Sequence, residues 1–158
     1  MADADAVVGR LGELGFELPR SQATVTKYRW AVRDGDVVHL AGHGPFVDGS
    51  PRFQGKVGRD LTIEQGYEAN RVTALAILRT LKDELGSLER VVRPLSQVNY
   101  VNLVEGYPAE FIEVGNGSTD LWSDLWGEDV ALCARITVGV AELPMGVPTA
   151  ITSVWKVR

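Results

Sequence analysis

The chain has 158 residues, with sixteen lysines and arginines against twenty-one aspartates and glutamates, which gives a net charge of -5. This length fits one domain, and the acidic balance argues against a nucleic-acid-binding protein, which needs basic side chains to neutralise phosphates. One cysteine and two histidines are too few for an internal disulfide or a structural zinc site, so we expect no bound metal.

The N-terminal segment predicts no targeting signal. Its first residues are acidic where a secretory signal is basic, and no stretch approaches the ~20 apolar residues that span a bilayer. We therefore expect a cytoplasmic protein with a reduced thiol and no membrane partner. Residues 1–20 are predicted to form a short helix, Val7 to Leu14, and a linker, followed by one domain over residues 21–158.

A hairpin and a long helix are predicted in the first half of this domain. Two strand-like runs, 28–32 and 37–42, flank an Asp-Gly pair, which is typical of a hairpin turn. A loop rich in glycine and proline follows over residues 42–58. The next segment predicts a helix over 63–85, because Thr62 and Gln65 form a capping box and apolar residues recur at helical spacing: Ala74, Ile77, Leu78, Leu81 and Leu85, with Gly86 as the C-cap.

The second half predicts three strands and one helix. Residues 91–104 alternate as a long strand, in which Pro94 indicates an edge position or a bulge. A second helix is expected over 118–126, and two further strands over 135–143 and 149–157. The order ββ-α-β-α-ββ predicts an α+β or α/β fold, with α+β preferred, in which two helices cover one face of a single sheet.

Arg135 is the first candidate binding residue. Ile136, Val138 and Val140 share one face of its strand, and we expect this apolar face to lie against the helices. Arg135 would then lie on the opposite face among small neighbours, where its planar fork suits a carboxylate. An arginine that is salt-bridged or extended into solvent at the strand end is the alternative.

The histidines and the first aromatic residues are further candidates. His39 and His43 would be about 13 Å apart along a strand, which is too far to bind one metal ion. His43 lies between two glycines that let a ligand approach the backbone, although a loop histidine without function fits equally well. Tyr28 and Trp30 are expected either to line a pocket or to pack against another subunit. No glycine-rich phosphate loop is present, so we expect no cofactor.

Several motifs resemble the RidA/YjgF family. Residues 133–144, which contain Ala134-Arg135 and end in Leu143-Pro144, resemble the C-terminal signature of the family, and residues 35–42 resemble its hairpin strand. The stretches 55–61 and 116–121 resemble a longer branch of the same family. The resemblance extends over residues 18–157.

The resemblance implies a chorismate-mutase-like fold that forms a homotrimer, with the open sheet faces inward and ligand sites between subunits. The implied activity is hydrolysis of a reactive enamine or imine to a 2-oxo acid and ammonia. By position, Arg135 would hold the substrate carboxylate, Tyr28 would form the pocket wall and Asn116 would lie near the site. A turn before the second helix is the other interpretation of Asn116-Gly117.

One departure from the family bears on the activity. The family deaminases carry a glutamate on the last strand that helps to position water, and Ala150 stands in its place. The first hypothesis is an enzyme that acts on a small carboxylate or imine, by hydrolysis or by a diverged addition, elimination or cyclisation, with His43 as acid or base. The second is a non-catalytic trimer that binds a metabolite. A ribonuclease activity is opposed by the net charge.

Overall fold

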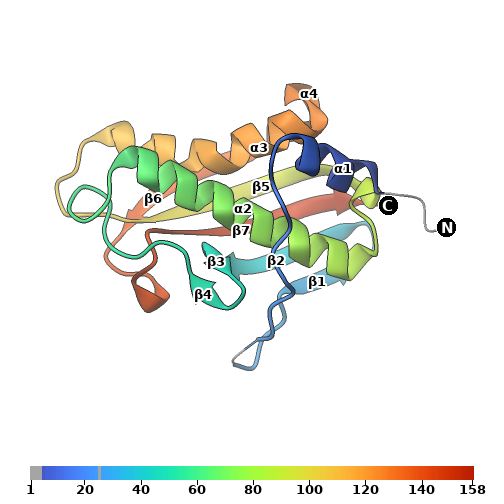
Figure 1. Ribbon diagram of the computed structural model, residues 1–158, viewed down its shortest axis with the longest axis horizontal. Helices are drawn as coiled ribbons and strands as arrows, with labels where there is room; N and C mark the ends of the chain where they lie inside the picture. The colour runs from blue at the N-terminus through green and yellow to red at the C-terminus, as the bar shows by residue number, and fades with distance from the viewer. Residues whose placement is uncertain (1–4, 25) are drawn as a thin grey trace.

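A computed structural model of the protein describes residues 5–24 and 26–158 (Figure 1). One mixed sheet has the strand order β1-β2-β7-β5-β6. The strands β5 and β6 run parallel, and the other neighbouring pairs are antiparallel. The strand bounds are Ala31–Asp34 for β1, Val37–His43 for β2, Val91–Asn102 for β5, Ala134–Val140 for β6 and Thr149–Val157 for β7.

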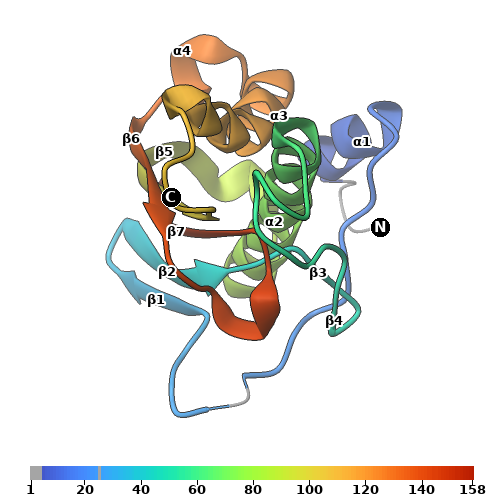
Figure 2. The same cartoon turned by 90° about the vertical axis from the view of Figure 1, so that its left-hand side faces the viewer.

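Two long helices, α2 (Ile63–Leu85) and α3 (Asn116–Trp126), lie together on one side of this sheet, as Figure 2 shows. The predicted α+β class, with one sheet covered on one face, is therefore confirmed. Shorter elements connect these parts: α1 (Ala6–Glu13), β3 (Phe46–Val47), β4 (Ser50–Pro51), η1 (Leu88–Arg90), η2 (Ala109–Gly115), α4 (Glu128–Ala131) and η3 (Pro144–Gly146). The predicted glycine- and proline-rich loop thus contains the small β3–β4 hairpin. No helix of the described residues is long and apolar enough to cross a membrane.

The helix α2 has the predicted bounds because both of its ends are fixed by local chemistry. The Thr62 hydroxyl accepts a hydrogen bond from the Gln65 amide, and the Gln65 side chain accepts one from the Thr62 amide. At the other end Gly86 has a φ of 81°, a conformation that glycine adopts at low cost. The apolar stripe between these caps is buried against the sheet.

The N-terminal segment packs onto the domain. Asp5 caps α1 and its carboxylate also accepts hydrogen bonds from the Leu88 amide and the Ser87 hydroxyl. Leu11 is only 1% exposed and joins the main core. Further along, the guanidinium of Arg71 lies 4.8 Å from the ring centre of Phe16. Residues 6–18 therefore contribute to the core of the domain.

The first strand differs from the sequence prediction at its start, whereas β5 begins at the predicted Val91. The first strand begins at Ala31 rather than at residue 28, because the Tyr28 amide turns back to the Thr26 carbonyl. In β5 the register shifts between Pro94 and Ser96, so Pro94 marks a bulge. The start of β5 is also a local edge, because its pairing with β6 begins at Ser96 and Pro94 pairs with β7 alone.

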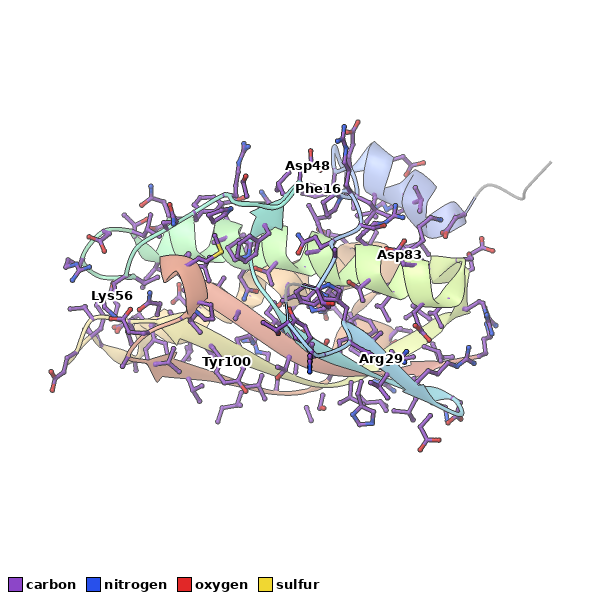
Figure 3. The ribbon with its side chains drawn as sticks, turned by 90° about the horizontal axis from the view of Figure 1, so that it is seen from below. Phe16, Arg29, Asp48, Lys56, Asp83 and Tyr100 are labelled. Carbon is purple, nitrogen blue, oxygen red and sulfur yellow. The ribbon has the colours of Figure 1, made fainter. Side chains whose placement is uncertain are left out.

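The sheet face away from the helices is not covered by any of the residues that the structure describes. Its side chains alternate with those that face the helices, and Figure 3 shows Tyr100 on this side of the sheet. Val32 and Ile136 are 54% and 55% exposed there. We call this surface the open face; its central members, by strand register, are Val32, His39, Val98, Tyr100, Ile136, Val138, Thr152 and Val154.

Candidate ligand-binding site

Arg135 lies on the face of β6 that the helices cover, which corrects the sequence prediction. Its side chain contacts residues at the start of α3, whereas Ile136 is on the open face. The prediction failed because it assumed that the more apolar face of an edge strand is the one that its own helices cover. On β6 the apolar side chains instead belong to the open face.

The guanidinium of Arg135 is held by three hydrogen bonds. Its Nη1 donates to the Gly115 carbonyl at 3.0 Å and to Thr119 Oγ1 at 2.6 Å, and its Nη2 donates to Asn116 Oδ1 at 2.8 Å. Arginine has five N–H groups. The Nε–H and one Nη2–H therefore have no partner among the described residues, on a side chain that is solvent-exposed. A guanidinium in this state can still donate to an anion.

A buried polar cluster supports this part of the structure. Asn70 of α2 accepts a hydrogen bond from the Ser118 amide and donates to Asn99 and Thr149. Gln97 donates to Ser118 Oγ at 2.6 Å and to Asn99. We call these five residues the polar cluster; each is at most 2% exposed. The cluster fixes the first turn of α3, which carries the partners of Arg135.

Two glycines let α3 come this close to its neighbours. A Cβ on Gly117 would lie 2.1 Å from the carbonyl oxygen of Tyr67 in α2, and one on Gly115 would lie 2.6 Å from Thr137 Oγ1. The Asn116-Gly117 pair is therefore not a turn, since Asn116 has a helical φ of -69°. Asn116 starts the helix and Gly117 permits the helix contact.

The aromatic candidates line a second region. Tyr28, Trp30 and His43 border a cavity of about 470 Å³ between the segment 20–23, the β3–β4 hairpin and η3. The ring centres of Trp30 and His43 are 4.8 Å apart, and those of Tyr28 and Trp30 are 5.2 Å apart. The structure thus brings these three candidates together.

Both ring nitrogens of His43 are engaged. Its Nδ1 lies 2.7 Å from the Ala41 carbonyl, which can only accept, so Nδ1 donates and Nε2 accepts from the Thr80 hydroxyl at 2.8 Å. Burial lowers the pKa of His43 to about 4, although the hydrogen bond to the Ala41 carbonyl opposes this shift. The ring is therefore neutral at pH 7, which favours a structural role for His43 in the wall of the cavity. Its role as an acid or base stays a prediction.

The two candidate regions lie at opposite edges of the sheet. Arg135 is on the edge strand β6, and Tyr28 and Trp30 precede the other edge strand, β1. Four steps of about 4.8 Å between neighbouring strands separate the two edges by about 19 Å. One small ligand cannot contact both regions of the same chain.

A family model described as "YjgF/chorismate_mutase-like, putative endoribonuclease" matches residues 8–146. The chain belongs to the YjgF/chorismate mutase-like family. A protein of Trypanosoma cruzi, "Protein TCP17", is 36% identical over 140 residues, which cover 89% of this chain and 87% of that protein. The predicted RidA/YjgF resemblance is thus confirmed at the level of the family.

Solved structures agree with this assignment. The protein Atu1372 of unknown function from Agrobacterium tumefaciens is 29% identical, with a TM-score of 0.87 over 98% of this chain and 95% of that one. Escherichia coli TdcF, solved with bound serine, has the same fold at 17% identity, with a TM-score of 0.62 over 90% of this chain and 96% of that one. Structures of RidA and of a protein described as an endoribonuclease also share the fold.

Within this YjgF-like chain, sequence reasoning missed several residues of the candidate site. Thr119 and Gly115 hold Arg135, and Thr80 holds His43, but no local pattern distinguishes them. Burial raises the pKa of Cys133, and the positive charges of Arg135 and Arg93 both oppose this rise. Two positive side chains therefore act on this end of the sheet, where the sequence suggested one.

Proposed function

We propose that this protein binds a small carboxylate of the 2-oxo acid or imine type at clefts between the subunits of a homotrimer. Arg135 anchors the carboxylate in this proposal. The observation that carries it is the guanidinium of Arg135, which three hydrogen bonds hold in place while two N–H groups remain available. Two parallel N–H groups match the two oxygens of a carboxylate.

The separation of the two candidate regions supports a shared site. A contact between the β6 edge of one subunit and the β1 side of the next joins two different surfaces, and such a contact forms a ring when the rotation between subunits closes. It would bring Arg135 and Asn116 of one subunit toward Tyr28, Trp30 and His43 of its neighbour. The exposed Val32 and Ile136 of the open face would be buried in the same assembly.

The reaction that fits this site is hydrolysis of an imine. Water adds to the carbon of the C=N bond, the C–N bond then breaks, and the products are a 2-oxo acid and ammonia. Because Ala150 offers no carboxylate and the low pKa of His43, about 4, makes its ring a weak base, the attacking water has no strong base among the candidate residues. A diverged addition, elimination or cyclisation on the same anchored acid is the related possibility within this proposal.

Calorimetric titration with pyruvate tests the anchor. Arg135→Ala should weaken binding at least tenfold, because charge-assisted hydrogen bonds contribute about 1.5–3 kcal/mol. Arg135→Lys keeps the charge but lacks the planar fork, and should recover only part of the affinity. Arg10→Ala, which removes an exposed arginine paired with Glu13 on α1, is the matched control. Equal pyruvate affinity in wild type and Arg135→Ala would refute the anchor.

Two measurements test the assembly and the turnover. Sedimentation should give a trimer, and Ile136→Glu on the open face should shift it to monomers; a wild-type monomer would refute the shared cleft. Imines generated in situ by a serine lyase should yield ammonia and 2-oxo acid faster than in buffer. Affinity for pyruvate without such turnover would favour the second candidate, a trimer that binds a metabolite without converting it.

A further inference from the structure

The cavity beside Trp30 is larger than a three-carbon acid requires. Its volume of about 470 Å³ falls within the range of about 300–1,000 Å³ that small-molecule sites occupy. At roughly 30 Å³ for each water molecule, this is the space of about fifteen waters. A substrate as small as pyruvate would fill only a minor part of it.

The walls of this cavity are predominantly apolar. Tyr28, Trp30, Phe46, Met145, Val147 and Ala150 contribute to them. Ala150 matters most, because a glutamate at this position would place a charge in the cavity. The indole N–H of Trp30 is buried and has no acceptor among the described residues, so a ligand oxygen that reached it would satisfy a donor.

Backbone strain gathers around the same cavity. Among the described residues, Asp48 and Met145 are the two non-glycine residues with a positive φ, at 50° and 57°. Both line this cavity. Such conformations cluster at ligand-binding sites, where the surrounding structure maintains them. For Met145 that support is visible, because Gln54 donates to its carbonyl at 2.9 Å and Gly55 donates to the next carbonyl at 2.7 Å.

We propose that this cavity receives a large apolar side chain of the substrate, so that the protein selects 2-oxo or 2-imino acids with branched aliphatic or aromatic side chains. The inference rests on the proposed function, because it assigns the side chain of the acid whose carboxylate Arg135 of a neighbouring subunit holds. Ala150 and the apolar walls determine the preference for size. Burial of each additional methylene group strengthens binding.

The test compares two acids that differ in the side chain alone. Pyruvate and 4-methyl-2-oxopentanoate are titrated calorimetrically into the full-length protein, and we expect the larger acid to bind at least tenfold more tightly. Ala150→Leu fills part of the cavity and should reduce this preference to less than threefold. If Ala150→Leu does not form the trimer, Ala23→Trp replaces it in this test. Ala23 lies in an exposed loop that borders the cavity, and a tryptophan there narrows the cavity. Ala6→Leu, on the exposed side of α1, is the control.

Fluorescence reports the occupied cavity directly. Trp122, Trp126 and Trp155 form a separate cluster, whereas Trp30 lines the cavity. Saturating 4-methyl-2-oxopentanoate should change the emission of the wild type, and Trp30→Phe should abolish this change. An unchanged emission in the wild type, or a change that persists in Trp30→Phe, would contradict contact with this wall.

The outcomes separate the two proposals. Equal affinity for the two acids, or a full preference that persists in both cavity variants, overturns the inference but leaves the anchor function intact. Failure of both acids to bind overturns the proposed function, and the inference with it. A size preference that is lost in Ala150→Leu and kept in Ala6→Leu supports both.

Discussion

The helix-covered face of the sheet has two halves of opposite character. One half is apolar: Val38, Ile77, Leu81, Trp122 and Trp155 are completely buried and pack together. The other half is the polar cluster of Asn70, Gln97, Asn99, Ser118 and Thr149. The two halves meet where the indole N–H of Trp122 donates to Gln97 Oε1 at 3.1 Å.

The difference separates stability from positioning. Apolar burial is non-directional and stabilises the fold in proportion to the area removed from water. Hydrogen bonds contribute only about 1 kcal/mol each, but they fix geometry, and an unpaired buried partner is costly. The polar half lies under the first turn of α3, which carries the residues that accept hydrogen bonds from Arg135. We therefore expect changes in the apolar half to alter stability and changes in the polar half to alter ligand affinity as well.

The largest expected effect is the removal of Trp155 from the apolar half. Its ring is completely buried, with its centre 5.0 Å from that of Trp122. Trp155→Ala should lower the free energy of unfolding by about 3–5 kcal/mol, measured by urea denaturation. Trp155→Phe should cost less and yield folded protein whose pyruvate affinity matches the wild type. A large loss of affinity in folded Trp155→Phe would break the division between the halves.

Acid should act on the cavity side of the fold through His43. Of the polar residues that are buried as whole residues in the described part of the chain, His43 is the titratable one. Its folded pKa of about 4 lies below the ordinary value of 6.5, so the unfolded chain takes up the proton first as pH falls. This contribution to the free energy of unfolding is complete above pH 6.5 and is lost as the pH falls to about 4. At 1.36 kcal/mol for each pKa unit, the loss is at most about 3 kcal/mol.

Denaturation of His43→Gln across this pH range checks the assignment. The variant should lose less stability than the wild type between pH 6.5 and 4, since glutamine carries no proton to exchange. Parallel pH profiles for wild type and His43→Gln would contradict a buried neutral ring.

Asn70 tests the polar half. Asn70→Leu keeps much of the volume but leaves the Ser118 amide and the Thr149 hydroxyl without this partner, so the free energy of unfolding should fall by about 2 kcal/mol. Pyruvate affinity should fall with it, because the first turn of α3 loses its support. Thr73→Val on the same helix removes a buried hydroxyl that bonds only within the helix, to Ala69, and should leave affinity unchanged. Affinity retained in Asn70→Leu would mean that the cluster is structural only.

The smallest expected effect is at Thr119, which contacts Arg135 directly. Thr119→Val removes an acceptor of the guanidinium at nearly constant volume. Stability should change by less than about 0.5 kcal/mol, as is usual for a substitution outside the core. Pyruvate affinity should fall about threefold in calorimetry. In free energy, this fall is smaller than the contribution of one typical hydrogen bond, about 1 kcal/mol. Thr119→Ser, which keeps the acceptor, should restore it.

The sequence predicted those parts of the fold whose signals are local. The bounds of α2 followed from a capping box and a C-terminal glycine, and those of β7 from alternation between turn residues. The face of Arg135 did not follow, because alternation defines two faces but does not say which one a helix covers. On an edge strand the open face can be the more apolar one, as Ile136 and Val138 demonstrate.

The structure gathers the candidate residues of the sequence into two groups. Arg135 and Asn116 lie together, as the resemblance implied, and so do Tyr28, Trp30 and His43. The cavity joins the segments 20–23, 42–49 and 144–150, which are distant in sequence. Contacts of this kind depend on the tertiary fold, so the strained Met145 and the polar cluster behind α3 had no signal in the sequence.

The position of β7 has a consequence for the order of folding. This strand (Thr149–Val157) lies at the centre of the sheet, between β2 and β5, although it follows every other strand in the chain. Until it is available, β1–β2 and β5–β6 are two separate pairs with no strand between them. Pairings between segments so far apart in sequence form slowly. The five-stranded sheet therefore cannot close before residues 149–157 are available to pair with both β2 and β5.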